Sequence, residues 1–227
     1  MTPGQTSRGY IVLVFGSTGT AGAGAIQACL AHPDVGEVRA VTRRPLGVAH
    51  AKLGEVRWSQ FADLGGIAHE LKGVNCCLFC LGTSVRNVSG ENEYREIHVT
   101  YALAAARTLR AEIPDASFVY LSGVGAKRTY RMMWARVKAE AEDRLAELKL
   151  TRHANVRPAA ILPIQPTGAN RLLLAPLLKV IPPLGIGAGD LGRGMLRLGL
   201  DRSWHGSRTL ENKELKMLLP SMKGEAR

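Results

Sequence analysis

The glycine-rich segment is the part of this sequence whose residue types and spacing most clearly indicate chemistry. It reads Gly16-Ser17-Thr18-Gly19-Thr20-Ala21-Gly22 and has the form G-x-x-G-x-x-G. In such a turn the first glycine permits a tight bend, the second lets the backbone approach a pyrophosphate, and the third lets a helix pack close to a strand. Free N–H groups at the helix N-terminus then face the anion. We predict that residues 16–22 bind the phosphates of a dinucleotide; the alternative is a glycine-rich turn without a ligand.

A second polar segment follows the second predicted strand and reads Val41-Thr42-Arg43-Arg44-Pro45. Proteins that bind NAD typically place an acidic residue at this point on the ribose 2′-hydroxyl, whereas arginine meets a 2′-phosphate. This segment contains no acidic residue, and a guanidinium matches phosphate geometry through paired hydrogen bonds. Arginines after a strand are also common without any such role. The sequence favours NADP(H) over NAD, with Thr42, Arg43 and Arg44 at the cofactor.

The elements that must position these segments alternate along the chain. Continuously apolar, β-branched runs indicate buried strands, and apolar residues at helical spacing indicate helices. The predicted strands are 10–15, 38–42, 56–59, 75–81 and 117–122, and the predicted helices are 21–32, 64–71, 91–113 and 131–150. Strands that alternate with helices pair in parallel through right-handed crossovers. The sequence therefore predicts an α/β, doubly wound parallel-sheet Rossmann fold.

The chain of 227 residues is expected to form a single domain. Its core is predicted to span residues 9–158. Residues 159–227, where prolines and glycines interrupt the periodicity, are interpreted as a small C-terminal substrate cap whose stretch 172–184 supplies an apolar pocket wall. Hydrophobic residues make up 46% and charged residues 22% of the chain, which excludes disordered and fibrous classes. No run approaches the length of a membrane span and no signal peptide is evident, so we expect a cytoplasmic protein.

The formal net charge of +11 suggests an anionic partner. The densest basic patch contains no acidic residue and comprises Lys127, Arg128, Arg131, Arg136 and Lys138. It is interpreted either as a solvated face or as a docking site for an acidic protein. Nucleic acid is not expected, because aromatic residues do not interleave with the arginines. A further alternative is an anionic membrane surface contacted through Arg171 and Lys179.

Cysteine and histidine spacing does not indicate a metal site or a disulfide framework. The cysteines are Cys29, Cys76, Cys77 and Cys80, and we interpret them as buried residues. The histidines are His32, His50, His69, His98, His153 and His205, and they lack ligand spacing. His98 falls on a predicted helix and is interpreted as a structural residue near the mouth of the site.

Several short motifs together resemble the atypical short-chain dehydrogenase/reductase superfamily. They are residues 16–22, Thr42-Arg43-Arg44, residues 76–83, Tyr120-Leu121-Ser122, Val137-Lys138-Ala139-Glu140 and residues 157–161. Within that superfamily the chain is most similar to the branch that includes the HIV Tat-interacting protein 30 and the NmrA-like proteins. The likeness covers most of the chain and is strongest over residues 10–158.

The resemblance implies a Rossmann fold that binds NADPH. It places Leu81, Gly82 and Thr83 beside the cofactor and the Arg157-Pro158 turn near the nicotinamide. After the third strand the superfamily often has an aspartate that contacts adenine, whereas this sequence has Gln60-Phe61. The adenine contact is therefore the part of the site where the sequence departs from the pattern.

Catalysis in this superfamily uses a tyrosine four residues before a lysine on one helix face, where the ammonium lowers the pKa of the phenol. Lys138 matches the lysine, but Trp134 stands in the tyrosine position, and an indole cannot exchange a proton at physiological pH. Ser122 keeps the position of the serine that orients a carbonyl oxygen. Tyr130 is the nearest phenol, but eight residues from Lys138 amounts to about 12 Å along a helix.

Three alternatives follow from the missing tyrosine. The protein is a reductase with a relocated acid, a reductase that relies on cofactor positioning and water, or an NADP(H)-binding protein without turnover. We favour an NADP(H)-dependent oxidoreductase that acts on a small or medium apolar carbonyl. The alternative is a catalytically silent regulatory or scaffold protein that binds NADPH.

Overall fold

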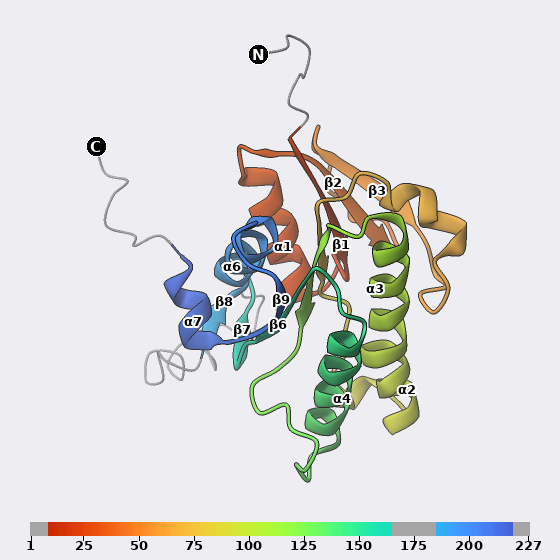
Figure 1. Cartoon of the computed structure of the whole chain (residues 1–227), viewed down its shortest axis with the longest axis vertical. Helices are drawn as coiled ribbons and strands as arrows, with labels where there is room; N and C mark the ends of the chain where they lie inside the picture. The colour runs from red at the N-terminus through yellow and green to blue at the C-terminus, as the bar shows by residue number, and fades with distance from the viewer. Residues whose placement is uncertain (1–8, 165–184, 220–227) are drawn as a thin grey trace.

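The computed structural model describes residues 9–164 and 185–219, which form a seven-stranded parallel sheet with helices on both faces (Figure 1). The sheet order is β3-β2-β1-β4-β5-β6-β9. Its strands are β1 (Tyr10–Phe15), β2 (Val35–Thr42), β3 (Leu53–Arg57), β4 (Cys76–Phe79), β5 (Ser117–Leu121), β6 (Arg152–Arg157) and β9 (Gly206–Glu211). A separate parallel pair joins β7 (Ala160–Leu162) to β8 (Gly185–Gly187). The predicted doubly wound fold is confirmed.

The helices form two layers. One layer packs against the sheet with α1 (Thr20–Ala31) and α6 (Ala188–Leu200), followed by the short α7 (Asn212–Met217). The other contains α3 (Tyr101–Glu112) and α4 (Met133–Glu147), with the short α2 (Glu91–Arg95) and the 3₁₀ turn η1 (Gly65–Leu71). The central strands β1 and β4 read as almost continuous apolar runs because both of their faces are covered.

Several elements begin or end at other residues than the spacing of apolar residues predicts. The predicted strand 38–42 begins earlier, at Val35, and the predicted strand 56–59 lies instead at Leu53–Arg57. The predicted helix 91–113 is interrupted by one π-helical turn, η3 (Glu96–Thr100), between α2 and α3. The predicted helix 131–150 ends before Lys149, which adopts a left-handed φ of 50°. Such a residue terminates a helix.

The described part of the C-terminal region completes the core rather than standing apart from it. After the cap segment, α6 packs across α1, and β9 pairs in parallel with β6 at the sheet edge. The two helices meet backbone to backbone, since a Cβ on Gly24 would overlap the carbonyl of Ala188 and one on Gly192 would overlap the carbonyl of Gly24. The predicted apolar pocket wall at 172–184 lies outside the described residues.

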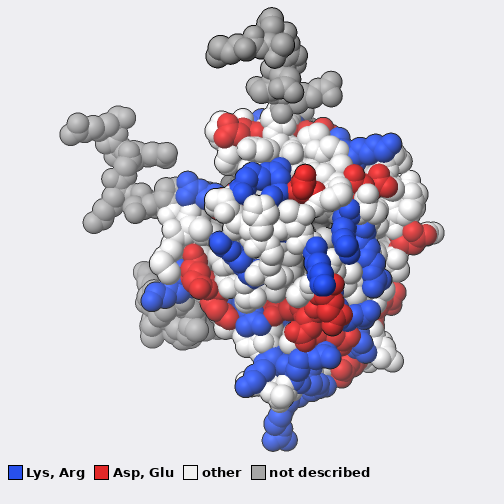
Figure 2. All heavy atoms as spheres, in the orientation of Figure 1, with Lys and Arg blue, Asp and Glu red and all other residues white. Residues whose placement is uncertain are grey.

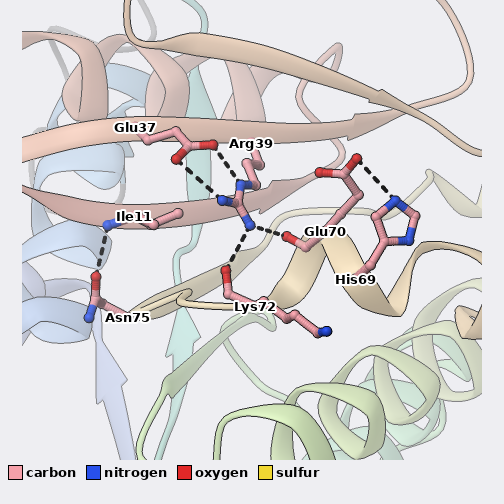
Figure 3. A network of polar contacts seen from close by, with 7 residues as sticks. All are labelled: Ile11, Glu37, Arg39, His69, Glu70, Lys72 and Asn75. Atoms are coloured by element: carbon pink, nitrogen blue, oxygen red, sulfur yellow. Dashed lines mark hydrogen bonds and ion pairs between the residues drawn. The ribbon is translucent and has the colours of Figure 1, made fainter. Parts of the chain in front are cut away.

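Arg39, on β2, lies at the centre of a network of polar contacts (Figure 3). Its Nε donates to Glu37 Oε1 at 2.7 Å, and its Nη1 donates to the carbonyls of Glu70 and Lys72. The guanidinium thereby ties β2 to the end of η1. Beside it, the amide of Ile11 donates to Asn75 Oδ1 at 2.8 Å. Because the guanidinium of Arg39 donates hydrogen bonds to these partners within the fold, we assign Arg39 a structural role.

We expect Gly192→Ala to destabilise the fold by about 1–3 kcal/mol, because the new methyl group forces α1 and α6 apart. Gly189→Ala, on the same helix, is the matched control. A Cβ there meets Gln27 Oε1 at an ordinary 3.5 Å, so the higher helix propensity of alanine leaves stability unchanged or raises it by up to about 1 kcal/mol. Denaturant unfolding of the two variants measures the difference. Equal stabilities would contradict the backbone contact.

Candidate active site

The glycine-rich turn lies where the order of the sheet reverses, between β1 and β4. Gly16 has a φ of +75°, and a Cβ on it would lie 2.5 Å from the amide nitrogen of Leu81. A Cβ on Gly22 would overlap the carbonyl oxygen of Gly16. Glycine is therefore required at both positions by the fold itself. Ligands of open α/β sheets bind in the crevice at this reversal point.

Gly19 is different, because nothing in residues 9–164 and 185–219 requires glycine there. Its φ of −85° and ψ of 167° suit any residue, and a Cβ would approach only the carbonyl oxygen of Gly16, at 3.4 Å. Gly19 is exposed and is the N-cap of α1, which has no side-chain cap and no acidic residue in its first turn. The first N–H groups of the helix are therefore free to bind an anion. The backbone at Gly19 is therefore open to the approach of a ligand, and we refer to this open surface as the glycine cradle.

The segment after β2 presents two arginine side chains from a fixed backbone. Thr42 Oγ1 donates to the carbonyl of Arg44 at 2.7 Å, and Arg57 Nη2 donates to the carbonyl of Arg43 at 2.7 Å. The side chains of Arg43 and Arg44 are exposed. Thr42 thus shapes the turn through its buried hydroxyl, while the two arginines remain available to a phosphate.

The predicted adenine contact divides into two unlike residues. Gln60 is exposed, and its carbonyl accepts a hydrogen bond from Trp58 Nε1 at 2.8 Å. Phe61 is buried, with ring centroids 6.3 Å from Phe15 and 5.7 Å from Tyr101. The structure therefore places the side chain of Phe61 in the hydrophobic core and leaves Gln60 at the surface beside it.

Residues 81–83 follow β4 and border a buried histidine that the sequence analysis treats as structural. His98 Nε2 lies 3.2 Å from both the amide nitrogen and the carbonyl oxygen of Thr83. Its Nδ1 is buried and has no partner among the described residues, and a Cβ on Gly82 would press against the ring. Burial and then the charge of Lys138 lower the pKa of His98 to about 2, so the ring is neutral.

His98 lies on the π turn η3, which gives it this position. A π turn inserts an extra residue into a helix and recurs at functional sites. The carbonyl of His98 accepts a hydrogen bond from the hydroxyl of Tyr120 at 3.1 Å. No periodicity signal predicts such a turn, because the apolar stripe continues on both sides of it.

Lys138 is buried at the centre of this half of the site. Its Nζ donates to the carbonyl of Leu121 at 2.7 Å and lies 4.9 Å from the ring centre of Tyr120. Burial lowers the pKa of Lys138 to about 7, and the negative charge of Glu142 opposes that shift. The structure thus brings Lys138, Tyr120 and His98 into one contact network at the carboxyl edge of β4 and β5.

The two other predicted catalytic positions lie near this network. The hydroxyl of Ser122 is buried and has no partner among the described residues, so it is available to a bound group. Trp134, on the first turn of α4, lies over the loop after β5, with its ring 3.7 Å from the Cβ position of Gly123 and 3.8 Å from that of Gly125. Tyr130 is exposed and precedes α4 altogether. The helix therefore offers an indole where a phenol is expected.

The side chain of Arg157 forms ion pairs with two carboxylates of the fold. Its Nε donates to Glu142 Oε1 at 2.9 Å, and its Nη1 donates to Glu211 Oε1 at 3.2 Å. Hydrogen bonding to Glu142 raises the pKa of the guanidinium. The side chain joins β6, α4 and β9, while the carbonyl of the neighbouring Pro158 accepts a bond from the amide of Val124 at 3.0 Å.

Residues 9–164 and 185–219 contain neither a cluster of metal ligands nor an exposed cysteine. These residues contain no group of three or more potential metal ligands of the His, Cys, Asp or Glu type. The four cysteines are buried free thiols, and burial raises the pKa of Cys80 to about 12. The same described ranges contain no helix with the length and hydropathy of a membrane span.

Comparison with known sequences finds distant relatives. No family model matches the chain. The chain is 28% identical over 140 residues to leucinostatins biosynthesis cluster protein T of Purpureocillium lilacinum, covering 60% of this chain and 51% of that protein. It is 24% identical over 149 residues to the mitochondrial protein FMP52 of Debaryomyces hansenii, covering 66% of each. The chain therefore spans about half the length of the first relative.

Solved structures share the fold over most of the chain. A short-chain dehydrogenase/reductase family oxidoreductase from Burkholderia thailandensis superposes with a TM-score of 0.70 and 16% identity, covering 91% of this chain and 93% of that one. A mutated uronate dehydrogenase gives 0.66 with 21% identity and coverages of 89% and 73%. MoeE5, solved with UDP-glucose and NAD, gives 0.67 with 16% identity and coverages of 88% and 75%. The chain has the Rossmann fold of the short-chain dehydrogenases and epimerases.

We expect two glycine substitutions in the turn to separate folding from ligand binding. Gly19→Ala should change stability by less than about 1 kcal/mol, yet weaken dinucleotide binding at least about tenfold, because the methyl group occupies the phosphate approach. Gly22→Ala should instead destabilise the fold by about 1–3 kcal/mol through overlap with Gly16. Thermal unfolding and calorimetric titration with NADPH and NADH measure both effects. Unchanged binding by Gly19→Ala would contradict the assignment of the cradle.

Proposed function

We propose that this protein is an NADP(H)-dependent oxidoreductase of the atypical short-chain dehydrogenase/reductase type, from the branch that includes the HIV Tat-interacting protein 30 and the NmrA-like proteins. The observation that carries the proposal is the open glycine cradle at an uncapped helix N-terminus, next to exposed Arg43 and Arg44. Gly19 is glycine where the fold does not need one, which is explained by a ligand that approaches its backbone.

The residues present fit a dinucleotide from end to end. Residues 16–22 hold the pyrophosphate, Arg43 and Arg44 bind the 2′-phosphate, and Gln60 lies at the adenine. Leu81, Gly82 and Thr83 flank the nicotinamide half, where Lys138 and the unpartnered hydroxyl of Ser122 provide polar contacts. The cofactor supplies the hydride when it is bound.

The proposed substrate is a small or medium apolar carbonyl. Leu81, Val85 and Trp134 are incompletely buried apolar residues in the segments that follow β4 and β5 at the carboxyl edge of the sheet, the edge that also carries the glycine-rich turn. Pockets for apolar ligands are lined by such side chains, with a few polar groups for orientation. The hydroxyl of Ser122 would orient the carbonyl oxygen. We propose that the protein acts in the cytoplasm.

A second candidate function is a silent NADPH-binding regulatory or scaffold protein. Trp134 favours it, because no phenol on α4 precedes Lys138 by four residues. The neutral His98 is no acid at neutral pH, since its pKa lies at about 2. In this alternative the fold binds NADPH as a structural ligand or as a ligand that the protein senses. An acidic protein partner would then bind the complex with NADPH.

Arg43→Ala should lower the affinity for NADPH by about 10- to 100-fold and leave the affinity for NADH unchanged, because it removes a charged hydrogen bond to the 2′-phosphate only. Arg107→Ala removes an exposed cation from α3 and serves as the control for general electrostatics. Isothermal titration calorimetry of each variant with both dinucleotides makes the measurement. Equal losses for NADPH and NADH, or no binding of either by the unmodified protein, would refute the NADP(H) assignment.

Trp134→Tyr should raise the rate of NADPH oxidation with apolar aldehydes and ketones by about 10²–10⁴-fold, the usual contribution of a positioned proton donor. Trp134→Phe is the matched control, because it removes the indole without adding a phenol. The decrease in NADPH absorbance measures turnover. Measurable turnover by the unmodified protein supports the oxidoreductase, and turnover only in Trp134→Tyr supports the silent protein. A Trp134→Tyr protein that binds NADPH but reduces no carbonyl would contradict the proposed catalytic roles of Lys138 and Ser122.

A further inference from the structure

The loop between β5 and α4 projects from the carboxyl edge of the sheet as a fixed structure (Figure 1). Its backbone is held at three points: the amide of Val124 donates to Pro158 O at 3.0 Å, that of Lys127 to Ala135 O at 3.2 Å, and that of Tyr130 to Lys127 O at 3.1 Å. Ala126 is buried beneath it. The side chains on the outside of the loop are therefore presented in a defined arrangement.

Three of these side chains are large and apolar. Val124 is 42% exposed, Tyr130 47% and Met132 51%. In the described part of the chain only four other large hydrophobic residues are exposed to a similar degree, and they are distributed over four separate segments. Exposed apolar side chains gathered in one loop mark an interaction site more often than isolated ones do.

The same loop carries cations that have no partner within the described residues. Arg128 pairs with Glu140 of α4 at 3.4 Å, and Arg136 of α4 donates to the carbonyl of Arg131 at 2.8 Å, so these two arginines brace the loop against α4. Lys127 and Arg131 are exposed, and no described carboxylate lies within ion-pair distance of either. Figure 2 shows Lys and Arg gathered at the lower end of the molecule, over this loop, with the acidic side chains set back from it.

We propose that this loop, residues 123–132, docks the protein on an anionic lipid surface. Lys127 and Arg131 would contact lipid phosphates, and Val124, Tyr130 and Met132 would enter the headgroup region. Tyrosine is favoured there because its ring is apolar and its hydroxyl remains hydrated. The loop is convex, so fluid lipid can close around it, whereas a rigid acidic protein would contact few of its residues.

The position of the loop gives the docking a consequence for the site. The loop leaves the strand end that carries Ser122, and Trp134 packs on its first residues. A membrane bound at residues 123–132 therefore lies at the mouth of the candidate active site. An apolar ligand could then enter from the lipid phase without crossing water.

The test is co-sedimentation of the full chain with vesicles of phosphatidylcholine alone or mixed in equal amounts with phosphatidylglycerol. The double variant Lys127→Gln/Arg131→Gln should reduce partitioning onto anionic vesicles about 25-fold, or about fivefold for each cation. Tyr130→Ser/Met132→Ser should reduce it about tenfold. Arg107→Gln/Arg110→Gln removes the same charge from exposed positions on α3, and Met217→Ser removes an exposed apolar side chain from α7; both controls should bind as the unmodified protein does.

Three results would overturn the proposal. The first is no sedimentation with anionic vesicles, and the second is an equal loss in the α3 control, which would attribute binding to the overall charge of +11. The third is loss in the charge variant but none in the serine variant, which would mean that the vesicles attract the loop by charge alone and that its apolar side chains do not enter the headgroup region. Thermal unfolding of each variant confirms that it is folded.

Discussion

The closeness of three backbone segments at the end of β1 is the constraint on which the rest of the structure depends. The turn at Gly16 packs on the backbone that leaves β4, and the first turn of α1 packs on the turn itself at Gly22. No side chain fits between these segments, so the helix N-terminus is fixed at the edge of the sheet. The half of the candidate site that we propose binds an anion therefore depends on the absence of side chains at these glycines.

The other half of the site is built in the opposite way, from buried polar side chains. Lys138 on α4 donates to the carbonyl of Leu121 and lies over the ring of Tyr120 on β5. The hydroxyl of Tyr120 donates to the carbonyl of His98 on the π turn η3. Glu142 lies one turn beyond Lys138 on α4 and binds Arg157. The carboxylate that raises the pKa of Lys138 is therefore held in place by Arg157 at the end of β6.

The positions of three parts of the candidate site could be predicted from the sequence because their signals are local. The glycine turn, the arginines after β2 and Lys138 are each defined by neighbours within a few residues. The contacts of Phe61 and Arg157 are not predictable from neighbouring residues, because their partners are distant in the sequence. Tyr101 lies beside Phe61, and Glu211 is 54 residues from Arg157. Two further features cannot be predicted in this way: the π turn at His98 and the close packing of α1 on α6. The spacing of apolar residues indicates neither an extra residue in a helix nor which helix packs against it.

The return of the chain to the sheet as β9 has a consequence for how this protein can diverge. The region after Pro158 leaves the core at β6 and is fastened again by α6, β9 and the pairing of Glu211 with Arg157. A segment anchored at both ends can exchange its residues, or lengthen, while its attachment points stay in place. Selection for a new ligand can then act between the anchors at little risk to folding, whereas truncation after β6 would remove α6, α7 and the edge strand β9 and expose the face of α1 that packs on α6.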